Sequence, residues 1–178
     1  MQSKPAGLLA LEDAFAPHVA AVARGWFETW QVAPLADAVR VRYSPRMFRA
    51  IGRAHPLRCL VTLAAGVRAL PEPTVLDILA HEFAHLAAYA RHGRGIRPHG
   101  REWASLMRGA GFQPRVRFAD EVAIDIVRAH ARIPLRYLHQ CRVCGASRES
   151  SRPMRRWRCG ACYEIGLDGR LEILRVGG

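Results

Sequence analysis

A regular stripe of large apolar side chains begins near the N-terminus. These residues recur at spacings of three and four: Leu8, Leu11, Phe15, Val19, Val22, Trp26 and Trp30. That period predicts one amphipathic helix of about six turns, with its apolar face against a core. A stripe of this kind is far more typical of core packing than of a ligand site. We therefore assign it to the scaffold.

Short runs rich in β-forming residues follow this helix. Val39–Tyr43, Met47–Ile51 and Arg58–Leu63 are separated by proline and glycine residues, which predicts a three-stranded sheet. An edge strand beside an active site can bind substrate backbone as an added strand. Arg58–Leu63 is our candidate for that strand.

The helical period returns between Thr74 and Arg91. Prolines precede this run and glycines follow it, and its apolar residues have helical spacing: Leu76, Leu79, Phe83, Leu86 and Ala90. Inside the run lies the pentad HEFAH, in which His81 and His85 are four residues apart on one helix face. Two imidazoles so placed can bind one zinc ion, and Glu82 can reach water beside it. We predict His81 and His85 as zinc ligands and Glu82 as the catalytic base.

A catalytic zinc site needs a third protein ligand, and three residues compete for this role. His92 lies about 10 Å along the helix axis from His85, too far to share one zinc ion. His99 precedes a second predicted helix that runs to about Met107, and we favour it. Glu102, in the first turn of that helix, is the alternative ligand, or it orients a ligand imidazole by a hydrogen bond.

Peptide hydrolysis at such a site often uses a second electrophile. It stabilises the scissile carbonyl oxygen as that oxygen gains negative charge. The candidates in this sequence are Tyr43, His55, His92 and Arg97. The sequence does not distinguish among them.

Four cysteines near the C-terminus form two CxxC pairs. Cys141 and Cys144 make the first pair and Cys159 and Cys162 the second, a spacing typical of a structural zinc site with four thiolates. A redox-active CxxC would need a βαβ frame, which this region lacks, and paired disulfides would need an oxidising compartment. We predict a zinc ribbon and two zinc ions per chain.

The ribbon is expected to contain short strands at Leu135–Gln140, Arg155–Arg158 and Leu171–Val176. The fifth cysteine, Cys59, lies in an apolar run and is most simply a buried core thiol.

The chain carries a net charge of +12, and 26 of its 27 basic residues are arginine. Positions 128–178 contain eleven arginines and four acidic residues, so positive charge is concentrated around the ribbon. Arginine forks suit phosphate oxygens, and an indole can stack on an unpaired base. The predicted nucleic-acid contacts are Arg142, Arg148, Arg152, Arg155, Arg156, Trp157 and Arg158. The plainer alternative is a solvated basic face, with Trp157 packed against the CxxC pairs.

The pattern of HExxH, a short connector, HGxEW on a second helix and a pair of CxxC knuckles is similar to the SprT-like (Spartan-type) zinc metallopeptidase family. The resemblance covers about residues 74–110 and 137–174. It implies an α+β, zincin-like domain over 1–118, made of an N-terminal helix, a small three-stranded sheet, the HExxH helix and the following helix. A connecting segment at 119–136, with a helix at Ala119–Arg132, and a small β zinc ribbon at 137–178 complete the prediction.

The resemblance also implies a substrate class: proteins that are bound or crosslinked to DNA. The expected partners are single-stranded or junction-containing DNA and the proteins on it. We expect a cytoplasmic, nucleoid-associated protein, because no apolar stretch approaches a membrane span and acidic residues interrupt the first apolar run before a signal peptide could form.

Two alternatives from other functional classes remain. One is a nucleic-acid-binding zinc protein with an inactive HExxH site, which the presence of Glu82 disfavours. The other is a zinc peptidase whose ribbon binds a protein partner.

Overall fold

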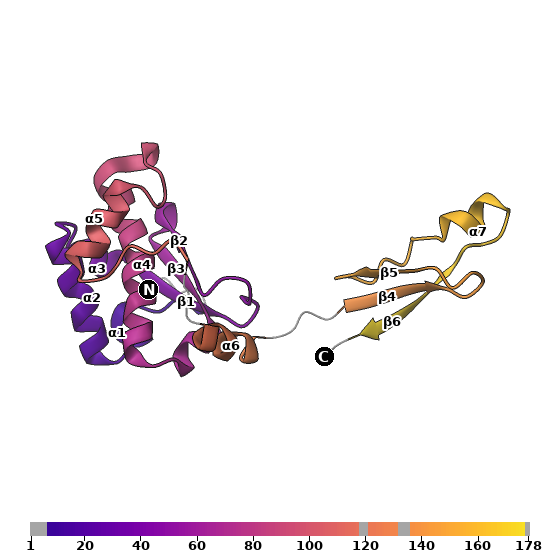
Figure 1. Ribbon diagram of the computed structural model, residues 1–178, viewed down its shortest axis with the longest axis horizontal. Helices are drawn as coiled ribbons and strands as arrows, with labels where there is room; N and C mark the ends of the chain where they lie inside the picture. The colour runs from indigo at the N-terminus through magenta and orange to yellow at the C-terminus, as the bar shows by residue number, and fades with distance from the viewer. Residues whose placement is uncertain (1–6, 118–120, 132–135, 177–178) are drawn as a thin grey trace, which may run out of the picture. The chain divides into compact units, whose positions relative to one another are not determined.

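The computed structural model describes residues 7–117, 121–131 and 136–176. The chain divides into two compact units, Met1–Ala131 and Arg132–Gly178, and each is described by itself (Figure 1). The predicted class is confirmed: the fold is α+β, with helices around a small sheet in the first unit and a small β unit after it.

The apolar stripe near the N-terminus forms two helices, not one. α1 (Leu11–Ala14) ends before α2 (Pro17–Thr29), so the prediction of a single helix of six turns was wrong. The reason is Pro17, which lacks an N–H and whose ring clashes with the preceding turn of a helix. It is therefore tolerated only in the first turn of α2. A further short helix, α3 (Leu35–Ala38), leads into the sheet.

The sheet of the first unit has three strands in the order β1-β3-β2. β1 (Arg40–Ser44) is parallel to β3 (Leu60–Ala64), and β2 (Gly52–His55) is antiparallel to it. β3 is central, which is why all five of its residues are buried. Two predictions were therefore wrong: Met47–Ile51 precedes the second strand, and Arg58–Leu63 does not supply an edge strand.

The first residues of that predicted strand, Arg58 and Cys59, belong to a turn. The 3-10 turn η1 (Pro56–Arg58) precedes β3, and Cys59 follows it with a left-handed backbone at φ 44°. The edge strand that contacts the long helix α4 (Glu72–His92) is β2.

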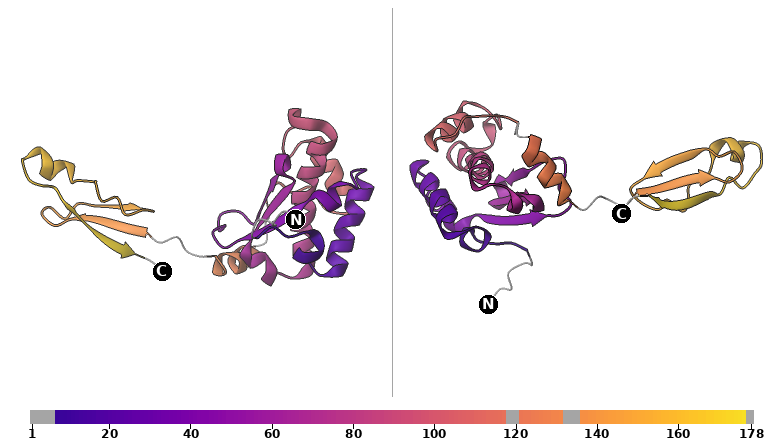
Figure 2. Two further views of the ribbon diagram at one scale, coloured as in Figure 1. Left: turned by 180° about the vertical axis from the view of Figure 1, so that it is seen from behind. Right: turned by 60° about the horizontal axis from the view of Figure 1, so that its bottom comes forward.

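α4 is the central helix of the first unit and packs against α2, β2 and α5 (Arg101–Gly109), as Figures 1 and 2 show. Its Phe83 lies 5.2 Å from Phe27 of α2, measured between ring centroids. Trp30 donates a hydrogen bond from Nε1 to the carbonyl of Leu106 at 2.9 Å, which ties α2 to α5. The short turns η2 (Ala65–Ala69) and η3 (Gly93–Gly95) flank α4 on either side.

The helix expected in the connecting segment is observed as α6 (Glu121–Ala129), and Ala119 and Arg132 lie outside the described residues. It packs on η2 so closely that a Cβ at Gly66 would lie 2.6 Å from the Cα of Val127. Ala123 and Val127 are buried in the core of the first unit. α6 is thus part of that unit and not a bridge between the two.

The second unit is a three-stranded antiparallel sheet in the order β5-β4-β6, with one short helix. Its elements are β4 (Arg136–Cys141), β5 (Ser147–Ser150), α7 (Gly160–Glu164) and β6 (Leu171–Val176). The predicted strand at Arg155–Arg158 was wrong. Pro153 and Met154 accept hydrogen bonds from Arg155 and Trp157 in tight turns, and Arg158 makes one isolated bridge.

Among the described residues, no helix has the length and apolar character needed to cross a membrane.

Candidate active site and metal centres

Three imidazoles converge on one point beside α4. The Nε2 atoms of His81 and His85 are 3.3 Å apart, and the Nε2 of His99 lies 3.2 Å from each of them. Nitrogen ligands at about 2.0–2.1 Å from a tetrahedral zinc ion would be about 3.3–3.4 Å from one another. The three residues therefore fit a zinc ion without rearrangement, as three corners of its tetrahedron.

The rings are fixed from behind by Trp103 and by backbone carbonyls. Trp103 is buried, stacks on His85 with ring centroids 5.6 Å apart, and donates a hydrogen bond to the carbonyl of His81 at 3.2 Å. The carbonyls of Arg115 and Pro98 accept hydrogen bonds from the rings of His81 and His85, respectively. Such contacts set the tautomer and direct Nε2 toward a metal.

Burial makes the two helix histidines neutral at physiological pH. It lowers the pKa of His81 to about 4 and that of His85 to about 3, and the proximity of the other imidazoles adds to both shifts. Burial also lowers the pKa of His99. A neutral imidazole has a free lone pair, which is the form that binds zinc.

Glu82 is buried between α4 and β2, with 8% of its surface exposed. Burial raises the pKa of its carboxyl group to about 7, while a hydrogen bond from the backbone of Ala54 and the charge of Arg53 act in the opposite direction. A carboxyl group with this pKa can both accept and donate a proton near neutral pH.

Gly52 makes room for that carboxylate. A Cβ at this position of β2 would lie 2.6 Å from Oε1 of Glu82 and 2.8 Å from its Cγ. Such distances are too short for any real Cβ contact, so a side chain here would displace Glu82. We did not predict this role of Gly52, although a glycine among β-forming residues is a signal of close approach.

Two cavities meet at the imidazole cluster. One has a volume of about 660 Å³ and extends past Asp77 and Arg115, and the other, of about 570 Å³, extends past Tyr89. Both are lined by His81 and Glu82, and by Gly52 and Val116. The cluster therefore lies between two spaces that can receive groups on either side of a scissile bond.

The competing residues lie outside this cluster. Neither Glu102 nor His92 belongs to the group of converging ligand atoms among the described residues. The carboxylate of Glu102 instead accepts a hydrogen bond from Nε of Arg101 at 2.9 Å.

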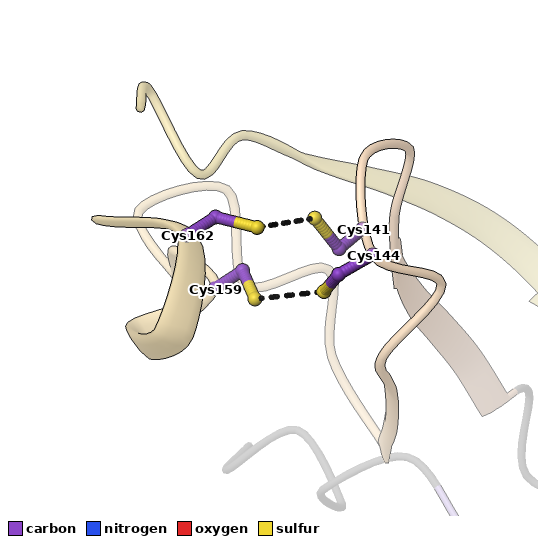
Figure 3. Close-up of side chains that lie close together, drawn as sticks. All are labelled: Cys141, Cys144, Cys159 and Cys162. Atoms are coloured by element: carbon purple, nitrogen blue, oxygen red, sulfur yellow. Dashed lines mark hydrogen bonds between the residues drawn. The ribbon is translucent and has the colours of Figure 1, made fainter. Parts of the chain in front are cut away.

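The four cysteines of the second unit also converge (Figure 3). Sγ of Cys141 is 3.7 Å from that of Cys162, and Sγ of Cys144 is 3.4 Å from that of Cys159. These distances far exceed the ~2.05 Å of a disulfide and approach the ~3.8 Å between thiolates on one zinc ion. Backbone N–H groups of Cys144 and Val143 lower the pKa of Cys141 to about 7, which favours the thiolate of that residue, whereas burial raises the pKa of Cys162.

The basic residues near the knuckles fall into two groups. Arg142 is paired with Glu172 at 2.8 Å, and Arg158 lies 3.6 Å from Asp168. In the described part of the chain, the exposed side chains of four others have no ion-pair partner: Arg148, which lies over the ring of Trp157, and Arg152, Arg155 and Arg156.

Trp157 is half-buried against the ribbon. Its ring lies 5.1 Å from that of buried His139, and the guanidinium of Arg148 lies over it at 4.4 Å. These contacts favour the packing role for Trp157 over base stacking. The role of His139 was not predicted: its Nε2 accepts a hydrogen bond from the backbone N–H of Met154 at 2.8 Å.

The chain is similar in sequence to known proteins. The model of the SprT-like family matches residues 23–125. Protein SprT of Pseudomonas syringae pv. tomato is 34% identical over 70 residues, which cover 39% of each chain. Protein SprT of Pseudomonas aeruginosa is 42% identical over 64 residues, 35% of this chain and 34% of the relative. The chain thus matches little more than a third of the length of these relatives.

Among solved structures, the metallopeptidase zymogen abylysin of Pyrococcus abyssi aligns with a TM-score of 0.40 and 23% identity. The alignment covers 61% of this chain and 87% of abylysin.

Proposed function

The chain belongs to the SprT-like family, and on that premise we propose that it is a zinc-dependent endopeptidase acting on proteins bound or crosslinked to DNA. The observation that carries the proposal is the convergence of three neutral imidazoles beside a buried carboxyl group, at the meeting point of two cavities. His81, His85 and His99 would hold the catalytic zinc ion, and the four cysteines a structural one.

Each residue of the centre has a distinct part in this proposal. Zinc, when bound, supplies a Lewis acid that polarises a carbonyl group and acidifies water. Glu82 takes the proton of the attacking water and passes it to the leaving amine. Its burial suits this role, because a carboxyl group with a pKa of about 7 is partly protonated at neutral pH.

The substrate backbone would lie along β2. This strand is at the edge of the sheet and carries Gly52 and Ala54, which contact Glu82. An extended peptide that adds to such an edge by main-chain hydrogen bonds is bound with little dependence on its sequence. Low sequence specificity suits a protease that acts on many different DNA-bound proteins.

The nucleic-acid part of the proposal is supported by charge. In the described part of the chain, Arg152, Arg155 and Arg156 are exposed, have no ion-pair partner and lie within five positions of the sequence, so their guanidinium groups can contact phosphates. Binding through them would concentrate the enzyme on DNA.

The proposal is tested by digesting a DNA-binding protein, with and without DNA, using wild type and Glu82→Gln. The variant keeps nearly the same shape and all three imidazoles, so zinc content should be unchanged while proteolysis falls by about 10²-fold or more. Glu28→Gln, at an exposed position of α2, is the matched control and should cleave like wild type. Undiminished cleavage by Glu82→Gln would show that Glu82 is not the base.

One observation favours the alternative of a peptidase with a protein-binding ribbon. Three apolar side chains near the knuckles are largely exposed: Val143 at 67%, Tyr163 at 66% and Ile165 at 75%. A salt titration of binding to single- and double-stranded DNA separates the two functions, because phosphate contacts make affinity fall steeply with salt.

A further inference from the structure

Tyr89 lies on the same face of α4 as the two helix histidines. It follows His85 by four residues, so the two side chains are neighbours on the helix surface. Long side chains of a helix lean toward its N-terminus, which directs Tyr89 back toward His85. Tyr89 lines the cavity of about 570 Å³ together with all three converging histidines and Glu82.

The hydrogen bonding of Tyr89 leaves its proton available. The phenol oxygen accepts a hydrogen bond from Nε of Arg94 at 3.1 Å. Because the guanidinium has only donors, the hydroxyl hydrogen of Tyr89 must point to another acceptor. Of the described residues that line this cavity, Tyr89 has the only hydroxyl group.

The four residues that the sequence suggested as the second electrophile are placed elsewhere. The hydroxyl of Tyr43 donates to the carbonyl of Ala14 at 3.2 Å, and Nε2 of His55 lies 3.4 Å from the hydroxyl of Thr62. Neither of these, nor His92 or Arg97, lines the two cavities that meet at the imidazole cluster.

We propose that the hydroxyl of Tyr89, oriented by Arg94, donates a hydrogen bond to the scissile carbonyl oxygen as that oxygen gains negative charge. This inference rests on the proposed protease function. A donor aimed at charge that develops only in the transition state accelerates the reaction without tightening substrate binding. Tyr89 is then a catalytic residue, and Arg94 is a positioning residue that acts through it.

The test compares wild type, Tyr89→Phe and Arg94→Met on a quenched fluorescent peptide. Tyr89→Phe keeps the ring and removes one donor, so kcat should fall by about 10²-fold while KM and zinc content stay near the wild-type values. Arg94→Met leaves the hydroxyl in place but unoriented, so its loss of kcat should be smaller. Tyr43→Phe is the matched control, because that hydroxyl is bonded away from the cavities, and it should cleave like wild type.

A second readout does not depend on turnover. The affinity of the zinc-loaded protein for a phosphinic peptide, which resembles the tetrahedral transition state, should weaken in Tyr89→Phe by about the same factor as kcat/KM. If Tyr89→Phe cleaved the peptide as fast as wild type, this inference alone would be overturned. The same holds if Tyr89→Phe lost kcat but bound the phosphinic peptide as tightly as wild type. Absence of Glu82-dependent cleavage by wild type would overturn both this inference and the proposed function.

Discussion

The two clusters of metal-binding side chains are built by opposite means. The histidines lie on a large hydrophobic core, in which Phe83 and Trp103 of α4 and α5 are almost fully buried. The cysteines have no such support: the buried apolar cluster of the ribbon, in its described part, consists of three of the cysteines with Leu171 packed against them.

This difference separates two uses of a metal ion. A fold that packs its ligands on an existing core can form without the metal, which then adds chemistry to the site. A fold whose ligands are themselves the core depends on the metal for its folding free energy. By this criterion we expect the first unit to be of the former kind and the ribbon to be of the latter.

The largest expected effect of this difference is the response to metal removal. A chelator should unfold the ribbon, since structural zinc contributes about 10–16 kcal/mol of apparent binding free energy in small zinc domains. Hydrogen exchange measured by segment should show β4 and β6 losing protection while α4 keeps it. Loss of protection in α4 to the same extent would contradict the claim that the first unit folds without metal.

Measuring the zinc content of variants tests the same difference between the two clusters. We expect two zinc ions per wild-type chain, because the two ligand sets share no residue. A folded His81→Ala/His85→Ala variant should retain about one, and its ribbon should be unaffected. A wild-type content near one would reject the two-site interpretation.

The parts of this fold that the sequence predicted are those with local causes. His81 and His85 converge because a helix places residues four apart on one face, and the glycines and prolines around α4 mark its ends. The cysteines of each pair are likewise brought together locally: Cys141 and Cys144 by a tight turn, and Cys159 and Cys162 by the first turn of α7. The break before α2 also had a local cause, Pro17, but the regular apolar stripe concealed it.

The parts that the sequence did not predict depend on long-range pairing. Which strand lies at an edge is decided by the order β1-β3-β2, and this order includes a parallel pair that no hairpin signal marks. The contact between Gly52 and Glu82 therefore could not be inferred before β2 was known to lie against α4. Tyr89 had a local signal, its spacing of four residues from His85. Its proposed role, however, depends on the cavity that it lines and on the hydrogen bond from Arg94, which the sequence does not reveal.

A smaller effect is expected from Gly52→Ala, which tests how tightly the first unit is packed around Glu82. The new Cβ would displace the carboxylate of Glu82, so kcat should fall by about tenfold or more while zinc content is unchanged. Gly25→Ala is the matched control, because a Cβ there meets no atom within 4 Å. Equal activity of both variants would mean that Glu82 tolerates displacement.

The smallest expected effect concerns the surface of the ribbon. If Arg152, Arg155 and Arg156 contact phosphates as proposed, replacing all three with alanine removes about three such contacts. The slope of log affinity for DNA against log salt should become shallower by about 2–3 units, since each contact contributes ~0.7–0.9. Replacing the exposed Arg46, Arg58 and Arg108 of the first unit with alanine removes the same net charge and should change the slope less.

The same arginine variants test whether the ribbon assists proteolysis by the first unit. If the ribbon brings the protease to DNA, the ribbon variant should cleave a DNA-bound protein more slowly and a free flexible peptide at the wild-type rate. Retained ribbon zinc must accompany this result, because an unfolded ribbon would also lose DNA binding. An unchanged affinity and salt slope would remove these arginines from the DNA interface. The exposed Val143, Tyr163 and Ile165 would then make a protein partner the better explanation of the ribbon.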